Sequence, residues 1–330
     1  MKTKTLILLI FMSLFASTVS CSQPKIIFDT DIGGDADDLG ALVMLNHFID
    51  RGECDLLAVM CWSTEKYAVS AIDAVNRFYG HPDIPLGARK DGTYHAAWNY
   101  TKAISDHFPH ELNHDNVPDA VVLYRKILAG SPDSSIVIVT VGPLKNIEDL
   151  LRSGSDTISG LTGKELIDCK VKEFVMMGGQ YPEGDNEWNF NGDMPGVTEY
   201  VISNLSVPLT FSGYELGEAI KTGEVFNDID PDTPLYVGFM HFSKNAPWMK
   251  YRFRGRILDN STFDQTAVLY AVRGGVNTYW DRVSGGRCVP DDKGGNKWVK
   301  DSDSNHSYLV LKMDSEKIAK HIERFMLGNF

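Results

Sequence analysis

The sequence is short of positive charge and of cysteine, and it has no long apolar run outside its first twenty residues. It holds 32 lysines and arginines against 44 aspartates and glutamates, a net charge of −12. A chain with that charge repels phosphate backbones, which argues against nucleic acid as a partner. Linkers, repeats and C-x-x-C pairs are also absent, so residues 21–330 are interpreted as a single domain. We expect buried free thiols rather than disulfides or a zinc site at Cys54, Cys61, Cys169 and Cys288.

The first twenty residues are interpreted as a secretion signal. Lys2 and Lys4 precede an apolar run, residues 6–15, that is too short to span a bilayer. Small residues then lead to Cys21, which is similar to the lipobox of bacterial lipoproteins, where the cysteine is lipidated and becomes the mature N-terminus. We therefore expect residues 1–20 to be removed and the protein to be exported, as a periplasmic or outer-membrane-anchored lipoprotein of a bacterium. Simple secretion is the alternative.

Short apolar runs alternate with amphipathic stretches along the rest of the chain. Runs rich in β-branched residues predict buried strands, and apolar residues at helical spacing predict helices. The predicted strands are 26–28, 56–60, 136–139 and 174–177, and the predicted helices are 38–49, 69–79, 121–128 and 315–327. This alternation predicts an α/β fold with an open, mainly parallel sheet and helices on both faces. The stretch from Arg282 to Asn305, rich in Gly, Asp and Lys, is expected to be a long irregular excursion.

Five carboxylates lie within ten residues after the first predicted strand. The segment is Asp29-Thr30-Asp31-Ile32-Gly33-Gly34-Asp35-Ala36-Asp37-Asp38, and a predicted helix follows at once. Ligands of open α/β sheets bind at the carboxyl ends of the strands, and the two glycines let the backbone turn sharply. Carboxylates so close together repel unless they are protonated or hold a cation, and hard oxygen donors favour Ca²⁺ or Mg²⁺. The alternative is a solvated acidic loop in which Asp37 or Asp38 caps the helix.

The same segment resembles the N-terminal signature of the inosine-uridine preferring nucleoside hydrolases, commonly D-T-D-P-G-x-D-D. This chain has Ile32 in place of the proline and two extra residues before the aspartate pair. Four more blocks resemble the family in its own order: Val141-Gly142-Pro143-Leu144-Lys145-Asn146, Met176-Met177-Gly178-Gly179, Glu187-Trp188-Asn189 with Asp193 following, and Phe263-Asp264-Gln265-Thr266-Ala267-Val268. The resemblance implies a Rossmann-like fold. It also implies calcium-dependent hydrolysis of the N-glycosidic bond of a ribonucleoside, or a related ribosyl compound, to free base and ribose.

The resemblance further implies a calcium site and a catalytic base. Asp31, Asp38, Asp264 and the backbone carbonyl of Val141 would bind one Ca²⁺, which would hold the attacking water and the ribose diol. Asp31 would also take the proton of that water. Only the main-chain oxygen of Val141 is needed, so valine in place of the family's threonine is compatible with this role. For Asp264 alone, a helix N-cap is the alternative.

Four residues are implied to bind the substrate. Asp37 would accept a hydrogen bond from a ribose hydroxyl, and Glu187 and Asn189 would hold the remaining ribose oxygens. Trp188 could stack on a base, although simple packing is the commoner use of such a side chain. For Asn189, the alternative is a turn residue.

Two departures from the family fall on substrate-recognition positions. Phe263 stands where the best-known members have a histidine proposed to protonate the leaving base, and Ser63-Thr64-Glu65 replaces an asparagine after the second strand. Either the base leaves with other help, from stacking or a different acid, or the substrate is not a common nucleoside. Surface positions are expected for the histidines nearest in sequence to a loop that could reach the site, His95, His107, His110 and His114.

Two other functions remain alternatives at this point. The chain could be a non-catalytic or repurposed surface protein that binds a nucleoside or glycoside with calcium, an alternative that Phe263 supports. The strand followed by Asp29-x-Asp31 is also similar to the opening of haloacid dehalogenase-type phosphatases, although no later acidic pair follows Met176-Met177-Gly178-Gly179. Because members of the nucleoside hydrolase family are commonly dimers or tetramers, the resemblance also implies a homodimer or homotetramer.

Overall fold

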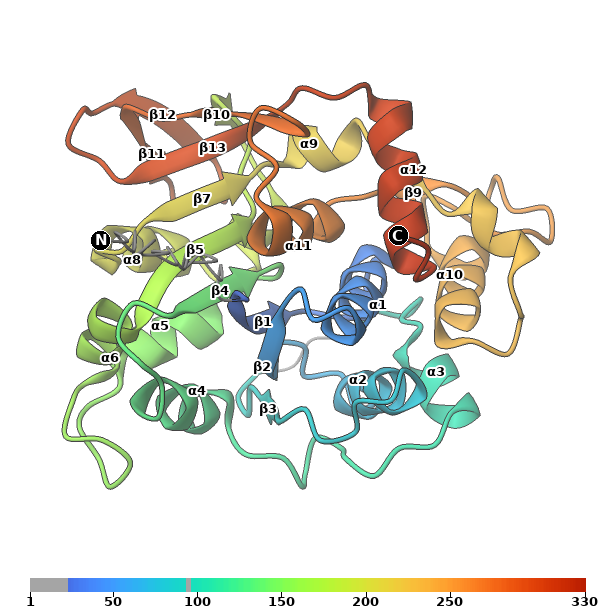
Figure 1. Ribbon diagram of the computed structural model, residues 1–330, viewed down its shortest axis with the longest axis horizontal. Helices are drawn as coiled ribbons and strands as arrows, with labels where there is room; N and C mark the ends of the chain where they lie inside the picture. Colours follow the sequence, from blue (N-terminus) through green and yellow to red (C-terminus); the bar gives the residue numbers. More distant parts are fainter. Residues whose placement is uncertain (1–22, 93–95) are drawn as a thin grey trace, which may run out of the picture.

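The computed structural model describes residues 23–92 and 96–330. Its main feature is an eight-stranded sheet in the order β10-β13-β7-β5-β4-β1-β2-β3 (Figure 1). Neighbouring strands are parallel except for the pair β10 and β13. The strands are β1 (Lys25–Thr30), β2 (Asp55–Cys61), β3 (Leu86–Ala88), β4 (Ile136–Thr140), β5 (Val171–Met177), β7 (Leu209–Ser212), β10 (Trp280–Val283) and β13 (His306–Leu311). The predicted α/β fold with a mainly parallel sheet is confirmed.

Helices cover both faces of the sheet (Figure 1). One face carries α1 (Asp37–Asp50), α2 (Ala68–Phe78), α10 (Pro234–Asn245), α11 (Asp264–Arg273) and α12 (Ser315–Met326), and the other carries α4 (Ala120–Ala129), α5 (Lys145–Arg152), α6 (Gly163–Lys170) and α8 (Val197–Asn204). Successive strand side chains point to opposite faces. A hydrophobic core lies between the sheet and the helices on each face. In β1, Ile26 and Phe28 point into the core on the α1 face, and Ile27 points into the core on the α4 face. Burial on both faces explains why the central strands are apolar throughout.

Among the strands from β1 to β7, the order reverses between β1 and β4. From β1 the chain moves outward through β2 to β3, then returns to the other side of β1 and moves outward through β4, β5 and β7. The loops that leave β1 and β4 therefore diverge at the carboxyl ends of two neighbouring strands. Open α/β sheets bind their ligands in the crevice that such a reversal creates.

The expectation of a long irregular excursion from Arg282 to Asn305 is wrong. Most of it forms an antiparallel hairpin of β11 (Gly286–Pro290) and β12 (Asn296–Lys300), and β12 also pairs with the short β6 (Glu183–Gly184). The polar composition reflects exposure of alternate residues, since Gly286, Cys288 and Pro290 are buried and the residues between them face solvent. An alternating, half-exposed hairpin has too few apolar residues to be distinguished from a loop by composition.

The cysteines of the described residues are all unpaired thiols, as expected. Cys54, Cys61 and Cys288 are buried, but Cys169 is exposed on α6, so the expectation of burial is wrong for that residue. The predicted signal segment, Cys21 and His95 lie outside the described residues. Within the described ranges, no helix has both the length and the apolar composition that crossing a bilayer requires.

Candidate active site

A cavity of about 630 Å³ opens at the carboxyl ends of the strands, where the loops that leave β1 and β4 diverge. Its walls come from the loops after β1, β4 and β5, from the short helices α7 (Trp188–Asn191) and α9 (Tyr214–Glu218), and from the start of α11. All eight residues assigned to the site from the sequence line it: Asp31, Asp37, Asp38, Val141, Glu187, Trp188, Asn189 and Asp264. The volume lies in the range of pockets that hold small organic ligands.

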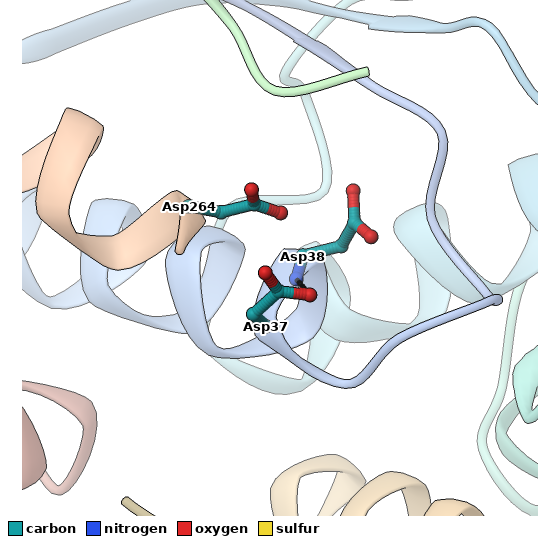
Figure 2. A group of neighbouring side chains, drawn as sticks. All are labelled: Asp37, Asp38 and Asp264. Atoms are coloured by element: carbon teal, nitrogen blue, oxygen red, sulfur yellow. Dashed lines mark hydrogen bonds between the residues drawn. The ribbon is translucent and has the colours of Figure 1, made fainter. Parts of the chain in front are cut away.

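Three carboxylates meet in this cavity. Asp37 and Asp38, at the start of α1, and Asp264, at the start of α11, each offer an oxygen within 4.8 Å of the others (Figure 2). All three are buried. Burial, and then the negative charge of the neighbouring aspartates, raises the pKa of each carboxyl well above its usual value. Such a group either holds protons or binds a cation, and a set of only oxygen donors suits a hard cation such as Ca²⁺.

The contact between α1 and α11 depends on a glycine. Gly40 follows Asp38 in the first turn of α1, and a Cβ on it would collide with the side-chain amide of Gln265 and lie 2.8 Å from the sulfur of Met326. Gln265 follows Asp264 directly. The missing side chain therefore lets the starts of the two helices approach and brings together carboxylates that are far apart in the sequence.

Asp31 lies in the cavity but outside the group of three. Its Oδ2 accepts a hydrogen bond of 2.9 Å from the indole Nε1 of Trp188. Burial raises the pKa of Asp31 to about 6, although the indole donor acts to lower it. Gly142, after β4, permits this position because a Cβ there would lie 2.8 Å from the Cβ of Asp31. The structure thus groups Asp37 with two of the residues assigned to the metal and leaves Asp31 beside them.

Asn189 joins the ends of two strands. Its side-chain Nδ2 donates to the carbonyl oxygen of Val141, at 3.0 Å, and to that of Met177, at 3.2 Å. The Val141 oxygen assigned to the metal therefore accepts one hydrogen bond and keeps a second lone pair. Asn189 belongs to α7 and fixes the loops after β4 and β5, so it is more than a turn residue.

Glu187 caps α7 from inside the cavity wall. Its carboxylate accepts hydrogen bonds from the backbone N–H groups of Asn189, Phe190 and Gly179, at 2.8–3.1 Å. Burial raises the pKa of Glu187 to about 7 despite these donors. A carboxylate can accept about four hydrogen bonds, so capping leaves room for one more donor from a ligand.

The other two acids of the first loop hold it in place. Asp29 accepts hydrogen bonds from the hydroxyl of Tyr124, at 2.8 Å, and from Nδ2 of Asn146, at 3.0 Å. Asp35 accepts one of 2.6 Å from Nδ2 of Asn260. Burial raises the pKa of both carboxyls to about 7. Asp29 thus anchors the end of β1 to α4 and α5.

One wall of the cavity is aromatic. Phe263 stacks on Tyr214 with ring centroids 5.1 Å apart, and Trp98 meets Trp248 edge to face at 5.6 Å. Tyr214 and Trp248 were missed in the sequence, where neither belongs to a motif. Only the packing of α9 and α10 brings them to the cavity.

None of the histidines among the described residues lines the cavity. His107 pairs with Asp232, while His110 and His114 line a separate cavity that shares no residue with this one. Glu65, from the segment that replaces the family's asparagine, is buried and accepts a hydrogen bond from the Thr101 hydroxyl.

Comparisons with known proteins agree with this geometry. A family model described as inosine-uridine preferring nucleoside hydrolase matches residues 26–320. No curated protein sequence matches the chain. Among solved structures, a plant nucleoside hydrolase, PpNRh1, superposes with a TM-score of 0.66 at 16% identity, over 92% of this chain and 98% of its own.

Two further structures show the same fold. An inosine-uridine preferring nucleoside hydrolase from Bacillus anthracis superposes with a TM-score of 0.65 at 13% identity, over 93% of this chain and 100% of its own. The type III effector XopQ, solved in complex with adenosine diphosphate ribose, superposes with a TM-score of 0.62 at 15% identity, over 93% of this chain and 92% of its own. At these identities the likeness concerns the fold.

Proposed function

Because the chain belongs to the inosine-uridine preferring nucleoside hydrolase family, we propose that it is a calcium-dependent enzyme that hydrolyses the N-glycosidic bond of a ribosyl compound. The products would be ribose and a free base. The observation that carries the proposal is the buried group of Asp37, Asp38 and Asp264, which lines one cavity with Asp31.

The donor set fits calcium. Asp38, Asp264, Asp31 and the carbonyl oxygen of Val141 would hold it, and the position of Asp37 in the group adds a further candidate ligand. Bound there, Ca²⁺ supplies positive charge that offsets the buried carboxylates, orients a ribose diol and lowers the pKa of a bound water. A donor set made only of oxygen atoms suits calcium better than zinc, because zinc sites are built mainly from nitrogen and sulfur ligands.

The chain's own residues would carry the chemistry as follows. Asp31 takes a proton from the attacking water, whose oxygen bonds to C1′ while the electron pair of the C1′–N bond stays with the base. With a pKa of about 6, Asp31 is ionised at neutral pH and remains basic enough for this transfer. Negative charge on the surrounding carboxylates stabilises the oxocarbenium-like ribosyl group in the transition state.

The remaining residues would position the substrate. Glu187 and Asn189 are fixed by α7 and would orient ribose oxygens, while Asp37 accepts a hydrogen bond from a hydroxyl. The aromatic wall of Phe263 and Tyr214 would stack on the leaving base. Since no imidazole lines the cavity among the described residues, the departing base would take its proton from solvent.

A second candidate is a calcium-dependent ribosyl-binding protein without turnover. Phe263 favours it, because it takes the place of the family's histidine and no described residue of the cavity wall is an imidazole. A fold shared with an effector solved in complex with adenosine diphosphate ribose is compatible with such a role.

Assays of the purified protein separate these functions. Inosine, uridine and adenosine are incubated with calcium or with a chelator, and released reducing sugar is measured. Release that depends on calcium supports the hydrolase. Stabilisation by a nucleoside without release supports the binding protein, and release of phosphate from phosphoesters would support the phosphatase alternative instead.

We also propose that the protein is exported and anchored by a lipid on Cys21, and that it assembles as a homodimer or homotetramer. The proposal of an anchor comes from the basic, apolar and small-residue pattern of residues 1–21. Metabolic labelling with a fatty acid, compared between the natural chain and Cys21→Ala, tests the anchor. Size-exclusion chromatography with light scattering tests the assembly.

A further inference from the structure

A second cavity, of about 720 Å³, adjoins the candidate active site. The two cavities share four lining residues: Asp35, Tyr214, Trp248 and Phe263. The shared wall is thus the aromatic one, on which the leaving group would stack. Residues 187–189, which would hold ribose oxygens, line only the first cavity. The second cavity therefore continues from the leaving-group side of the site.

The first cavity is already large enough for a small ligand. At about 630 Å³ it lies within the range of pockets that enclose drug-sized molecules. A ribosyl group with an ordinary base does not need the second cavity. That cavity is accounted for if the leaving group extends beyond the base.

The second cavity carries a cation that no carboxylate neutralises. Arg252 lines it, is exposed, and forms none of the ion pairs found between described residues. The other lining cation, Lys221, is paired with Glu218 at 3.1 Å. Two further acids line the cavity. Asp259 accepts a hydrogen bond of 2.7 Å from the backbone N–H of Glu224, and Asp35 accepts one of 2.6 Å from Nδ2 of Asn260.

Arg252 belongs to a concentrated run of positive charge. Between Asp232 and Asp259 the chain has no acidic residue, yet it contains five cations: Lys244, Lys250, Arg252, Arg254 and Arg256. All five are exposed, in a protein whose net charge is −12. Of this run, Arg252 lines the second cavity, where its positive charge attracts an anion. The planar guanidinium of Arg252 can bind a carboxylate or a phosphate through two hydrogen bonds.

We propose that the second cavity binds an anionic substituent on the leaving base, so that the substrate class is a ribosyl compound whose base carries a carboxylate or phosphate extension. Arg252 receives this anion, and the aromatic wall of Tyr214, Phe263 and Trp248 stacks on the base. The inference rests on the proposed function for the position of the ribosyl group. Binding energy at the distant anion can be used to hold the base where it leaves.

Three nucleosides test the proposal, and two of them carry extensions of similar length. Adenosine is the parent, N6-(1,2-dicarboxyethyl)adenosine carries two carboxylates at the edge of the base away from the ribose, and N6-butyladenosine has a similar extension without charge. Affinity is measured by calorimetry with calcium present, and kcat/KM by release of ribose. We expect the dicarboxyethyl compound to exceed the butyl compound about tenfold or more, since a hydrogen bond to a charged group contributes about 1.5–3 kcal/mol.

Arg252→Gln identifies the residue responsible. It should remove most of this preference and leave adenosine unchanged. Arg256→Gln, in the same run but outside both cavities, should keep the preference. The proposal would be overturned if the natural protein had equal affinity and equal kcat/KM for the two extended compounds. It would also be overturned if the Arg252→Gln variant kept the preference.

The two proposals fail in different ways. Tight binding of the dicarboxyethyl compound that Arg252→Gln weakens, without release of ribose, would support this site and contradict the hydrolase. Turnover of adenosine with no preference for the anionic compound would support the hydrolase and contradict this site. Binding of none of the three nucleosides would contradict both.

Discussion

Asp31 is the residue on which the proposed chemistry depends most. Its Oδ2 accepts the indole N–H of Trp188, and burial holds its pKa near 6, so it is both fixed in position and partly basic at neutral pH. Asp31→Asn keeps the acceptor oxygen and the size of the side chain but cannot take a proton. We expect kcat to fall by roughly 10²–10⁴, the usual contribution of a general base.

The measurement is ribose release at saturating nucleoside and calcium, with circular dichroism to confirm the fold. Trp188→Phe is the matched comparison, because it removes the donor and leaves the base. Its loss of activity should be much smaller. A turnover in Asp31→Asn equal to that of the natural protein would show that another group accepts the proton.

Phe263 offers a test of how the leaving base is protonated. It stacks on Tyr214 at the cavity wall, directly before Asp264. Phe263→His places an imidazole beside the leaving base, where it can donate a proton. We expect kcat for inosine to rise at least about tenfold below pH 7, since general acids contribute roughly 10²–10⁴ when well placed.

Phe263→Leu is the control for Phe263→His, because it removes the aromatic ring without supplying a proton. It should lower activity through lost stacking. Should both variants respond alike, the effect would come from the altered packing and the acid would not be what limits the natural enzyme.

At the scale of elements, the contact between α1 and α11 brings together the carboxylates of Asp37, Asp38 and Asp264. Gly40 has no side chain where Gln265 and Met326 pack against it. Gly40→Val forces the two helices apart, which we expect to cost about 1–3 kcal/mol of unfolding free energy, as overpacking commonly does. Calcium affinity should fall further than stability alone explains, because Asp264 moves away from Asp38.

The matched control for Gly40→Val is Gly154→Val, since nothing lies within 4 Å of a Cβ at Gly154. Calcium titration and chemical denaturation are compared for the two variants. An affinity that survives in a destabilised Gly40→Val variant would mean that the group does not require this helix contact.

The sequence was enough to predict the elements that are buried on both sides or amphipathic over several turns. β4 and α12 are examples, because their apolar periodicity is set by the core that they face. The hairpin of β11 and β12 was not predicted, since half of its residues face solvent. Composition alone could not separate it from a loop.

Site residues that belong to a contiguous sequence motif could be predicted, and those that only the fold brings to the cavity could not. The acidic loop before α1 is a contiguous motif, so Asp37 and Asp38 could be identified from it. Tyr214 and Trp248 could not, because no motif surrounds them and only long-range packing brings them to the cavity. The hydrogen bond from Trp188 to Asp31 is likewise a product of the fold.

At the scale of the whole molecule, the buried acids link stability to pH and to calcium. Burial raises the pKa of Asp29, Asp35 and Glu187 to about 7. The native state therefore holds protons between about pH 4 and 7 that the unfolded chain has released, and stability falls as pH rises through this window. We expect the chelated protein to melt at a lower temperature at pH 8 than at pH 5.

Calcium should oppose this trend, because it offsets the negative charge of Asp37, Asp38 and Asp264, whose pKa values burial also raises. At 100 times its dissociation constant, a ligand adds about 2.7 kcal/mol to the unfolding free energy. Melting temperatures at pH 5 and pH 8, with calcium and with chelator, provide the measurement. Magnesium at the same concentration is the control. A chelated protein that is more stable at pH 8 would contradict the expected direction.

The position of Asp264 in the chain has a consequence for how the protein is made. A ribosome delivers Asp37 and Asp38 early and Asp264 only after most of the sheet has been synthesised. A chain that ends before α11 keeps the acidic loop but lacks its third carboxylate. The proposed calcium site would therefore be incomplete in any chain that ends before Asp264. Bound calcium would then stabilise a chain that contains α11 and would not stabilise a shorter intermediate to the same extent.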